Sequence, residues 1–188
     1  MKYFLAFLGV IALIVVVFVM IFHDFSGHKT TPTQAPLTDY ATTVTQMRYT
    51  LEGPVTADQN YNAVRITIGR DANTIEILQG YQDQVIDAKT YPNNSDAYAV
   101  FLRSLQLQGY TKGDATPANA DERGFCPNSQ RYLYEIITGA TEVQRYWRGA
   151  CTAGTFKGNA ATVQDLFTRQ IPDYDSMTQN LDLGSSGF

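Results

Sequence analysis

The sequence predicts an α+β protein: an N-terminal transmembrane helix, a linker, and then an antiparallel β-sheet with two helices packed on one face. Three observations support this prediction. The chain opens with a long apolar run, its middle contains segments in which apolar and polar residues alternate, and two later segments repeat apolar residues at helical spacing. At 188 residues, the chain has room for one domain beyond the apolar run.

Residues 3–22 form an uncharged apolar run of 20 residues, about the length that a helix needs to cross a hydrocarbon core of ~30 Å. A cleaved signal peptide is the alternative, but its core is usually ~7–15 residues long and a small-residue cleavage site follows it. No Ala-x-Ala follows this run closely. Because Lys2 precedes the run, the positive-inside tendency favours a cytoplasmic N-terminus. We therefore predict a single-pass anchor in the cell membrane with an extracytoplasmic C-terminal domain.

Composition changes along the chain predict the domain boundaries. The transmembrane anchor is expected at residues 1–25. Residues 26–38 are rich in Ser, Thr and Pro, which is typical of a flexible linker. The α+β domain is expected at residues 39–175, and residues 176–188 end in a Gly- and Ser-rich tail.

Alternation of apolar and polar residues predicts the strands, and capping residues predict the helices. The expected strands cover residues 41–52, 64–69, 74–78, 84–90, 131–137 and 142–148. The last two flank residues 138–141 (TGAT), which is a hairpin signal. One helix is expected to begin at Ser95 and end at Gly109, and a second to begin at Asn159 and end before Pro172.

The chain has two cysteines, Cys126 and Cys151. A pair in an extracytoplasmic domain most often forms a disulfide. This bridge would close a loop of 26 residues and stabilise the fold by about 3.5 kcal/mol through chain entropy. Two buried free thiols are the alternative. No metal site is expected, because two thiolates need further ligands and both histidines, His23 and His28, lie beside the membrane.

The predicted domain lacks the residues of several common catalytic sites. Without a histidine it has no Ser-His or Cys-His nucleophile, and it contains no glycine-rich phosphate loop. We therefore assign no catalytic residue and no cofactor. Its acidic balance argues against nucleic-acid binding. Four carboxylates remain available for acid–base chemistry: Glu76, Asp87, Glu135 and Glu142. Glu76 and Glu135 alternate with apolar neighbours, which predicts solvent-facing positions.

Aromatic and cationic residues are interleaved in the predicted hairpin. Tyr, Trp and Arg are the residues that dominate binding hot spots, and Arg beside aromatic rings suits anionic or glycan ligands. The candidate binding residues are Arg131, Tyr132, Tyr134, Arg145, Tyr146, Trp147 and Arg148. The alternative is a hairpin whose aromatic side chains pack into the core around a disulfide.

Several segments of the second half carry a resemblance: residues 121–127 (DERGFCP), 131–135 (RYLYE), Trp147 with Cys151, 154–158 (GTFKG), Phe167 and 170–174 (QIPDY). In these the chain resembles a group of N-terminally anchored surface proteins of small-genome, host-dependent bacteria. The resemblance implies a bacterial membrane-anchored domain with paired cysteines. The group has no established activity, so the resemblance brings no catalytic residues.

Together these features favour a membrane-anchored binding or interaction domain outside the cytoplasm, with an envelope protein or glycan as the class of partner. One alternative is a structural subunit of an envelope assembly, in which the transmembrane helix contacts other helices through the small residues Gly9 and Ala12. A carboxylate-based cell-wall enzyme is the weaker alternative.

Overall fold

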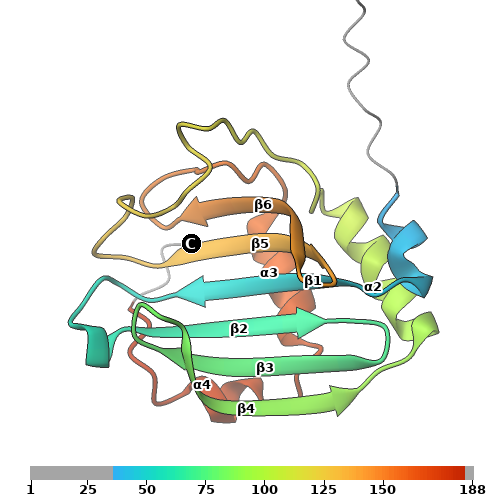
Figure 1. Cartoon of the computed structure of the whole chain (residues 1–188), viewed down its shortest axis with the longest axis horizontal. Coiled ribbons are helices and arrows are strands. Elements are labelled where there is room, and N and C mark those ends of the chain that lie inside the picture. Colours follow the sequence, from blue (N-terminus) through green and yellow to red (C-terminus); the bar gives the residue numbers. More distant parts are fainter. Residues whose placement is uncertain (1–35, 185–188) are drawn as a thin grey trace, which may run out of the picture. The chain divides into compact units, whose positions relative to one another are not determined.

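A six-stranded antiparallel sheet organises residues 36–184, the part of the chain that the computed structural model describes (Figure 1). The strands are β1 (Thr45–Glu52), β2 (Asn62–Ile68), β3 (Ala72–Gln79), β4 (Gln84–Pro92), β5 (Arg131–Thr138) and β6 (Thr141–Gly149). Their order across the sheet is β4-β3-β2-β1-β5-β6, so β1 joins the β2–β4 meander to the β5–β6 hairpin. All neighbouring pairs are antiparallel.

Helices cover one face of this sheet, so the α+β prediction is confirmed. Figure 1 shows α3 (Ala160–Thr168) and the short α4 (Tyr174–Thr178) behind the strands, with α2 (Ser95–Leu107) at one end. Two 3-10 turns, η1 (Leu37–Thr42) and η2 (Asp58–Asn60), precede β1 and β2. The sequence predicted α2 and α3, whereas α4 was not expected.

Side-chain caps fix where the two long helices begin. The Asn94 side chain accepts hydrogen bonds from the backbone N–H groups of Asp96 and Ala97, so the cap of α2 lies one residue before the predicted Ser95. Asn159 caps α3 as predicted, accepting from the N–H of Thr162. Such caps satisfy amide groups that have no partner within the helix. Gly109 follows α2 with a φ of +73°, a conformation that favours glycine.

Two segments outside the predicted domain limits pack against the folded core. Leu37, in the expected linker, belongs to η1 and is fully buried. The strand expected from residue 41 therefore begins only at Thr45. Leu181 and Leu183, in the expected tail, pack against the helix-covered core.

The core between the sheet and the helices is rich in aromatic rings. Phe167 of α3 lies within 5.1–5.8 Å of the rings of Phe101, Tyr110 and Tyr49. Rings at these separations stabilise a core beyond the apolar area that they bury. Phe167 thus connects α2 and α3 with the central strand β1.

The predicted disulfide between Cys126 and Cys151 is confirmed, with 5.6 Å between the Cα atoms. It joins the loop before β5 to the segment after β6. The predicted anchor, residues 3–22, lies outside the described residues. Among the helices within residues 36–184, none has the length and apolar character to span a membrane.

Candidate functional site

The sheet face opposite the helices, called the open face here, is lined by charged side chains. Because the strands are paired in register, alternate residues of neighbouring strands form rows across this face. In one row Arg48 of β1 lies opposite Glu135 of β5, which lies opposite Arg145 of β6. In the next row Arg65 of β2 lies opposite Glu76 of β3.

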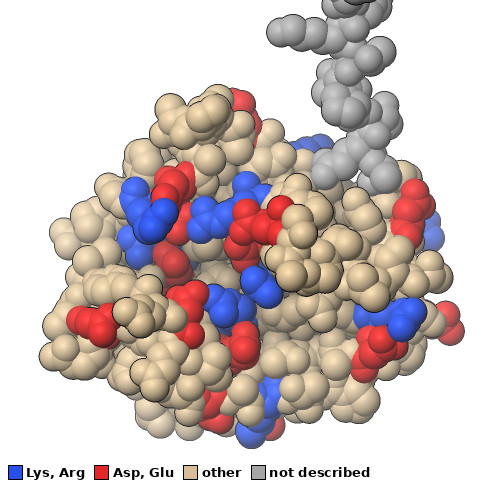
Figure 2. Space-filling view, viewed as in Figure 1, with Lys and Arg blue, Asp and Glu red and all other residues tan. Residues whose placement is uncertain are grey.

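A groove of about 690 Å³ runs over the open face. One wall comes from residues 120–123 of the loop before β5, and the other from Tyr81 and Asp83 in the turn between β3 and β4. Figure 2 shows blue and red side chains interleaved across this face. The arginines that line the groove are Arg48, Arg65, Arg123 and Arg145. Its acidic residues are Glu52, Asp83, Asp121, Glu122, Glu135 and Glu142.

Arg145 is surrounded by three of these carboxylates. Its Nη2 lies 2.5 Å from Glu122, and its Nε lies 3.4 Å from Glu135 and 3.8 Å from Glu142. Its Nη1 also donates to the carbonyl of Ala120 at 3.3 Å. Since Glu122 and Ala120 belong to the loop before β5, Arg145 holds that loop against the sheet.

Glu135 is the groove carboxyl whose protonation changes near neutral pH. Burial, followed by a hydrogen bond with Glu142, raises the pKa of Glu135 to about 7 against the lowering effects of Arg48 and Arg145. Burial and the neighbouring carboxyl both disfavour the charged form of Glu135. Glu135 therefore keeps its proton to a higher pH than a free carboxyl does.

Arg48 has no carboxylate within 4.0 Å among the residues that the structure describes. Its Nε is buried and has no hydrogen-bond partner. The Nε of Arg65 is likewise buried without a partner, but its Nη atoms form ion pairs with Glu76 and Asp83. A buried donor without an acceptor is costly. The groove thus contains one guanidinium whose charge no neighbouring carboxylate directly compensates.

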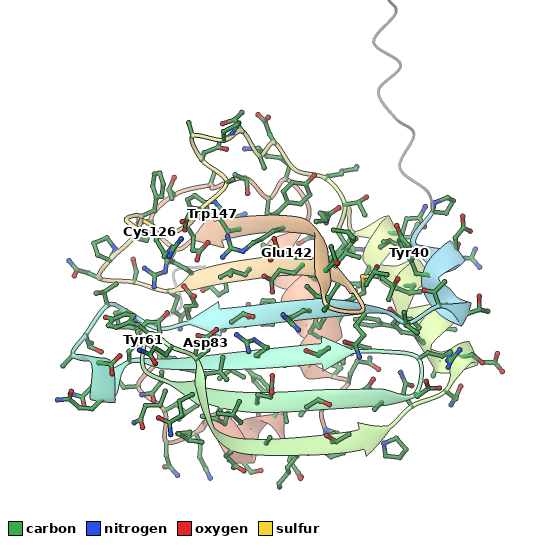
Figure 3. The ribbon with its side chains drawn as sticks, viewed as in Figure 1. Tyr40, Tyr61, Asp83, Cys126, Glu142 and Trp147 are labelled. Atoms are coloured by element: carbon green, nitrogen blue, oxygen red, sulfur yellow. A yellow bond between two sulfur atoms is a disulfide. The ribbon has the colours of Figure 1, made fainter. Side chains whose placement is uncertain are left out.

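An aromatic pair borders the groove at the turn between β3 and β4. Tyr61 and Tyr81 stack with ring centroids 4.5 Å apart, and Figure 3 shows Tyr61 and Asp83 close together. The Tyr81 hydroxyl donates to the carbonyl of Thr56 at 2.6 Å, which fixes this half-exposed ring. Behind it, Arg131 forms a 2.8 Å ion pair with Glu52. Because Tyr61 is buried, the ring accessible to a ligand at this end is that of Tyr81, beside fixed charges.

The seven candidate residues from the sequence lie on two different faces. Arg131, Arg145 and Trp147 project toward the open face, whereas Tyr132, Tyr134, Tyr146 and Arg148 project toward the helices, as alternation in a strand requires. Tyr132 and Tyr134 are 1% and 0% exposed. The sheet therefore does not bring the seven together as one surface.

Trp147 is buried, although it lies on the open face. Its indole Nε1 donates to the carbonyl of Asn119 at 2.7 Å, and its ring lies 4.9 Å from that of Phe125. Both contacts are with the loop before β5. Trp147 thus supports the groove wall from below.

Glu135 is not solvent-facing, contrary to the sequence prediction, because the loop before β5 covers the second face of that strand. Glu76 is partly exposed, with a side-chain exposure of 28%. Alternation assigned both residues to the correct face, but it carried no information about the loop above them.

Sequence reasoning did not single out Arg48, Arg65, Tyr81, Asp83 or Glu122. Arg48 and Arg65 carried a signal, since each follows an apolar residue in an alternating segment and so belongs to the polar face. Their position beside Glu135 and Asp83 depended on strand register and on the turn between β3 and β4.

Within residues 36–184 the structure contains no group of three or more His, Cys, Asp or Glu side chains arranged to hold a metal ion. No known protein family matches the chain, and no curated protein is a detectable relative.

Proposed function

We propose that the domain is a binding module, tethered to the cell membrane and located outside the cytoplasm, that captures its ligand in the groove of the open face. The observation that carries this proposal is Arg48: a guanidinium that lines the groove and has no carboxylate within 4.0 Å among residues 36–184. An anionic ligand group would pair with its Nη atoms.

The ligand chemistry that suits the groove best is a carboxylate on an otherwise polar molecule. A carboxylate matches the fork of a guanidinium and forms charge-assisted hydrogen bonds with it. Because acidic side chains also line the groove, a strongly anionic polymer would be repelled. An acidic segment of an envelope protein and a carboxylate-bearing glycan share this chemistry.

Two features support a location outside the cytoplasm. The disulfide between Cys126 and Cys151 is typical of an oxidising compartment. The apolar run at residues 3–22 has the length of a membrane span. The resemblance to anchored bacterial surface proteins agrees with the same location.

Photocrosslinking in intact cells tests the proposal and separates the two ligand sources. A photoreactive residue replaces Val143, an exposed residue that lines the groove, in the full-length protein. The matched control is Val100, an exposed valine on α2. We expect adducts from Val143 alone, containing either an envelope protein or wall glycan. Equal yields from both positions, or none from Val143, would contradict the proposal.

The same experiment addresses the assembly alternative. If the protein is a structural subunit held by its anchor, replacing residues 3–22 with an unrelated transmembrane segment should abolish the Val143 adduct. A tethered binding module should retain it, because the groove makes the contact.

Acid catalysis in the groove is a second candidate function, favoured by one observation. Glu135 has a pKa of about 7 and lies beside Glu142, so it holds a transferable proton at neutral pH. Incubating the full-length protein with cell-wall fragments tests this candidate. New products that disappear in Glu135→Gln would support it, and no products between pH 5 and 8 would eliminate it.

A further inference from the structure

The two outer edges of the sheet differ in how they are covered. Beside β6, the backbone N–H groups of Thr155 and Phe156 both donate to the carbonyl of Trp147 at 2.9 Å, and Gly149 donates to Thr152 at 3.1 Å. The segment after β6 thus occupies that edge. Beyond β4 no other strand pairs among the residues that the structure describes, and Figure 1 shows β4 as the border of the sheet.

The β4 edge is long and exposed. β4 contains nine residues, all of them exposed except Tyr91. Val85 and Ile86 are 46% and 49% exposed, which is high for apolar residues in a strand. An edge of this kind carries unpaired N–H and C=O groups that form a template for another strand.

The charges on β4 are arranged so that the strand complements itself. Asp87 and Lys89 lie two residues apart, opposite Ile77 and Ile75, and therefore project toward the same side of the sheet. In an antiparallel pair of β4 strands centred on Ala88, each Asp87 lies opposite Lys89 of the second copy. Centring the pair on residue 87 or residue 89 instead places like charges opposite each other.

We infer that the β4 edge is a homodimer interface, in which β4 pairs antiparallel with β4 of a second copy around a two-fold axis at Ala88. β4 has a bulge at Ile86, because Val85 and Asp87 pair with the consecutive residues Leu78 and Ile77 of β3. The proposed pairing therefore rests on the regular stretch around Ala88, where Asp87 and Lys89 are the cross-strand neighbours. The charges oppose a strand of unrelated sequence, but they attract a second copy of the same strand.

The fold leaves Lys89 able to make the new contact. Its Nζ donates to Asp173 of the same chain at 2.8 Å. An ammonium group has three donors, so others remain for Asp87 of the second copy. Since Asp87 and Lys89 project to the same side, the two-fold axis is perpendicular to the sheet. The two open-face grooves then lie on one side of a continuous sheet, which allows bivalent capture.

Disulfide trapping at the proposed axis tests this interface in the full-length protein in its membrane. In the proposed register the two copies of residue 88 face each other directly, at the ~4.5–5.5 Å Cα separation of an antiparallel pair, which a disulfide can span. Ala88→Cys should therefore yield a covalent dimer on mild oxidation. The matched control is Gln84→Cys on the same strand, whose two copies would be ~26 Å apart, eight residues at about 3.3 Å each.

Charge exchange provides an independent test of the register. In the Ala88→Cys background, Asp87→Lys places lysines opposite each other, and Lys89→Asp places aspartates opposite each other. Each change alone should lower the dimer yield roughly tenfold. Mixing the two variants should restore it as a heterodimer, because every opposed pair is then of opposite charge.

Three outcomes would overturn the inference. Gln84→Cys could crosslink as readily as Ala88→Cys, which would indicate random collision. Mixing the two charge variants could fail to restore the dimer, which would contradict the register. Ala88→Cys could trap a different protein, or nothing, which would mean that the edge does not pair with a second copy.

Discussion

Arg48 and Glu135 are direct cross-strand partners on β1 and β5, yet their side chains form no ion pair within 4.0 Å. Glu135 turns instead toward Arg145 and Glu142 on β6. Below the sheet, the hydroxyl of Tyr110 lies 2.7 Å from the Arg48 carbonyl and 2.9 Å from the Glu135 carbonyl. The backbone beneath the pair is therefore fixed, while the Arg48 guanidinium has no carboxylate partner among residues 36–184.

Removing the Arg48 guanidinium should stabilise the fold. Arg48→Met keeps the length of the side chain and removes a buried donor that has no acceptor. We expect the free energy of unfolding to rise by about 1 kcal/mol. Denaturant titration of the full-length protein in mild detergent at pH 5, where Glu135 is protonated, measures this. Arg103→Met, at an exposed position of α2, is the control. A destabilised Arg48→Met would show that the guanidinium has a structural role.

The stability of the protein should fall as pH rises from about 5 to about 7.5. Burial raises the pKa of Glu135 from the ordinary value of 4.5 to about 7 in the folded state, so mainly the folded state holds this proton in that interval. Stability then decreases with pH, by at most about 1.4 kcal/mol per pH unit for one group, and levels off above pH 7.5. Denaturant titrations across this interval measure the slope.

Glu135→Gln should reduce that slope, because the amide does not titrate. A smaller slope of the same sign should remain, since burial also raises the pKa of Glu52 despite its ion pair with Arg131. An unchanged slope in Glu135→Gln would mean that another group causes the pH dependence.

Trp147→Ala should loosen the groove wall. The change removes a buried ring and the hydrogen bond from Nε1 to Asn119. We expect a loss of about 3–5 kcal/mol in stability and faster hydrogen exchange across residues 114–127. Trp147→Phe, which keeps most of the packing, should lie between this variant and the wild type. Wild-type exchange in Trp147→Ala would show that the indole does not support the loop.

Breaking the disulfide should destabilise the domain without changing its fold. Replacing both Cys126 and Cys151 with alanine removes a cross-link of sequence separation 25. The expected loss is about 3.5 kcal/mol if chain entropy dominates. Denaturant titration compares the double variant with the oxidised wild type. An effect below about 1 kcal/mol would indicate that chain entropy does not dominate, for example because the unfolded chain without the cross-link retains structure.

Local sequence patterns predicted the strands and helices, but they did not predict the groove. All six strands were predicted, although β1 begins at Thr45 rather than at residue 41, and Asn159 was recognised as a cap. Alternation, turn signals and caps all depend on neighbours in sequence. The groove depends on contacts between distant segments. Glu122 reaches Arg145 across 23 positions, and Tyr110 reaches Arg48 across 62 positions. No periodicity in the sequence reports such pairings.

The hairpin shows the same division between local and long-range information. The sequence placed Arg145 and Trp147 in a strand beside a partner strand, as the structure confirms. The sequence did not distinguish the β5 residues that face the helices from those that face the loop before β5. Both sets are buried, so the strand shows no contrast between a buried and an exposed face. Register and loop packing decided which arginines became accessible.

Ligand capture by two matched arginine variants tests the central claim most directly. Full-length Arg48→Gln and Arg103→Gln are each purified after crosslinking in intact cells, and the captured material is compared with that of the wild type. We expect Arg48→Gln to capture at least tenfold less partner than the wild type, because a charge-assisted contact is lost. Arg103→Gln should capture as much as the wild type. Wild-type capture by a folded Arg48→Gln variant would contradict the claim that this groove binds through Arg48.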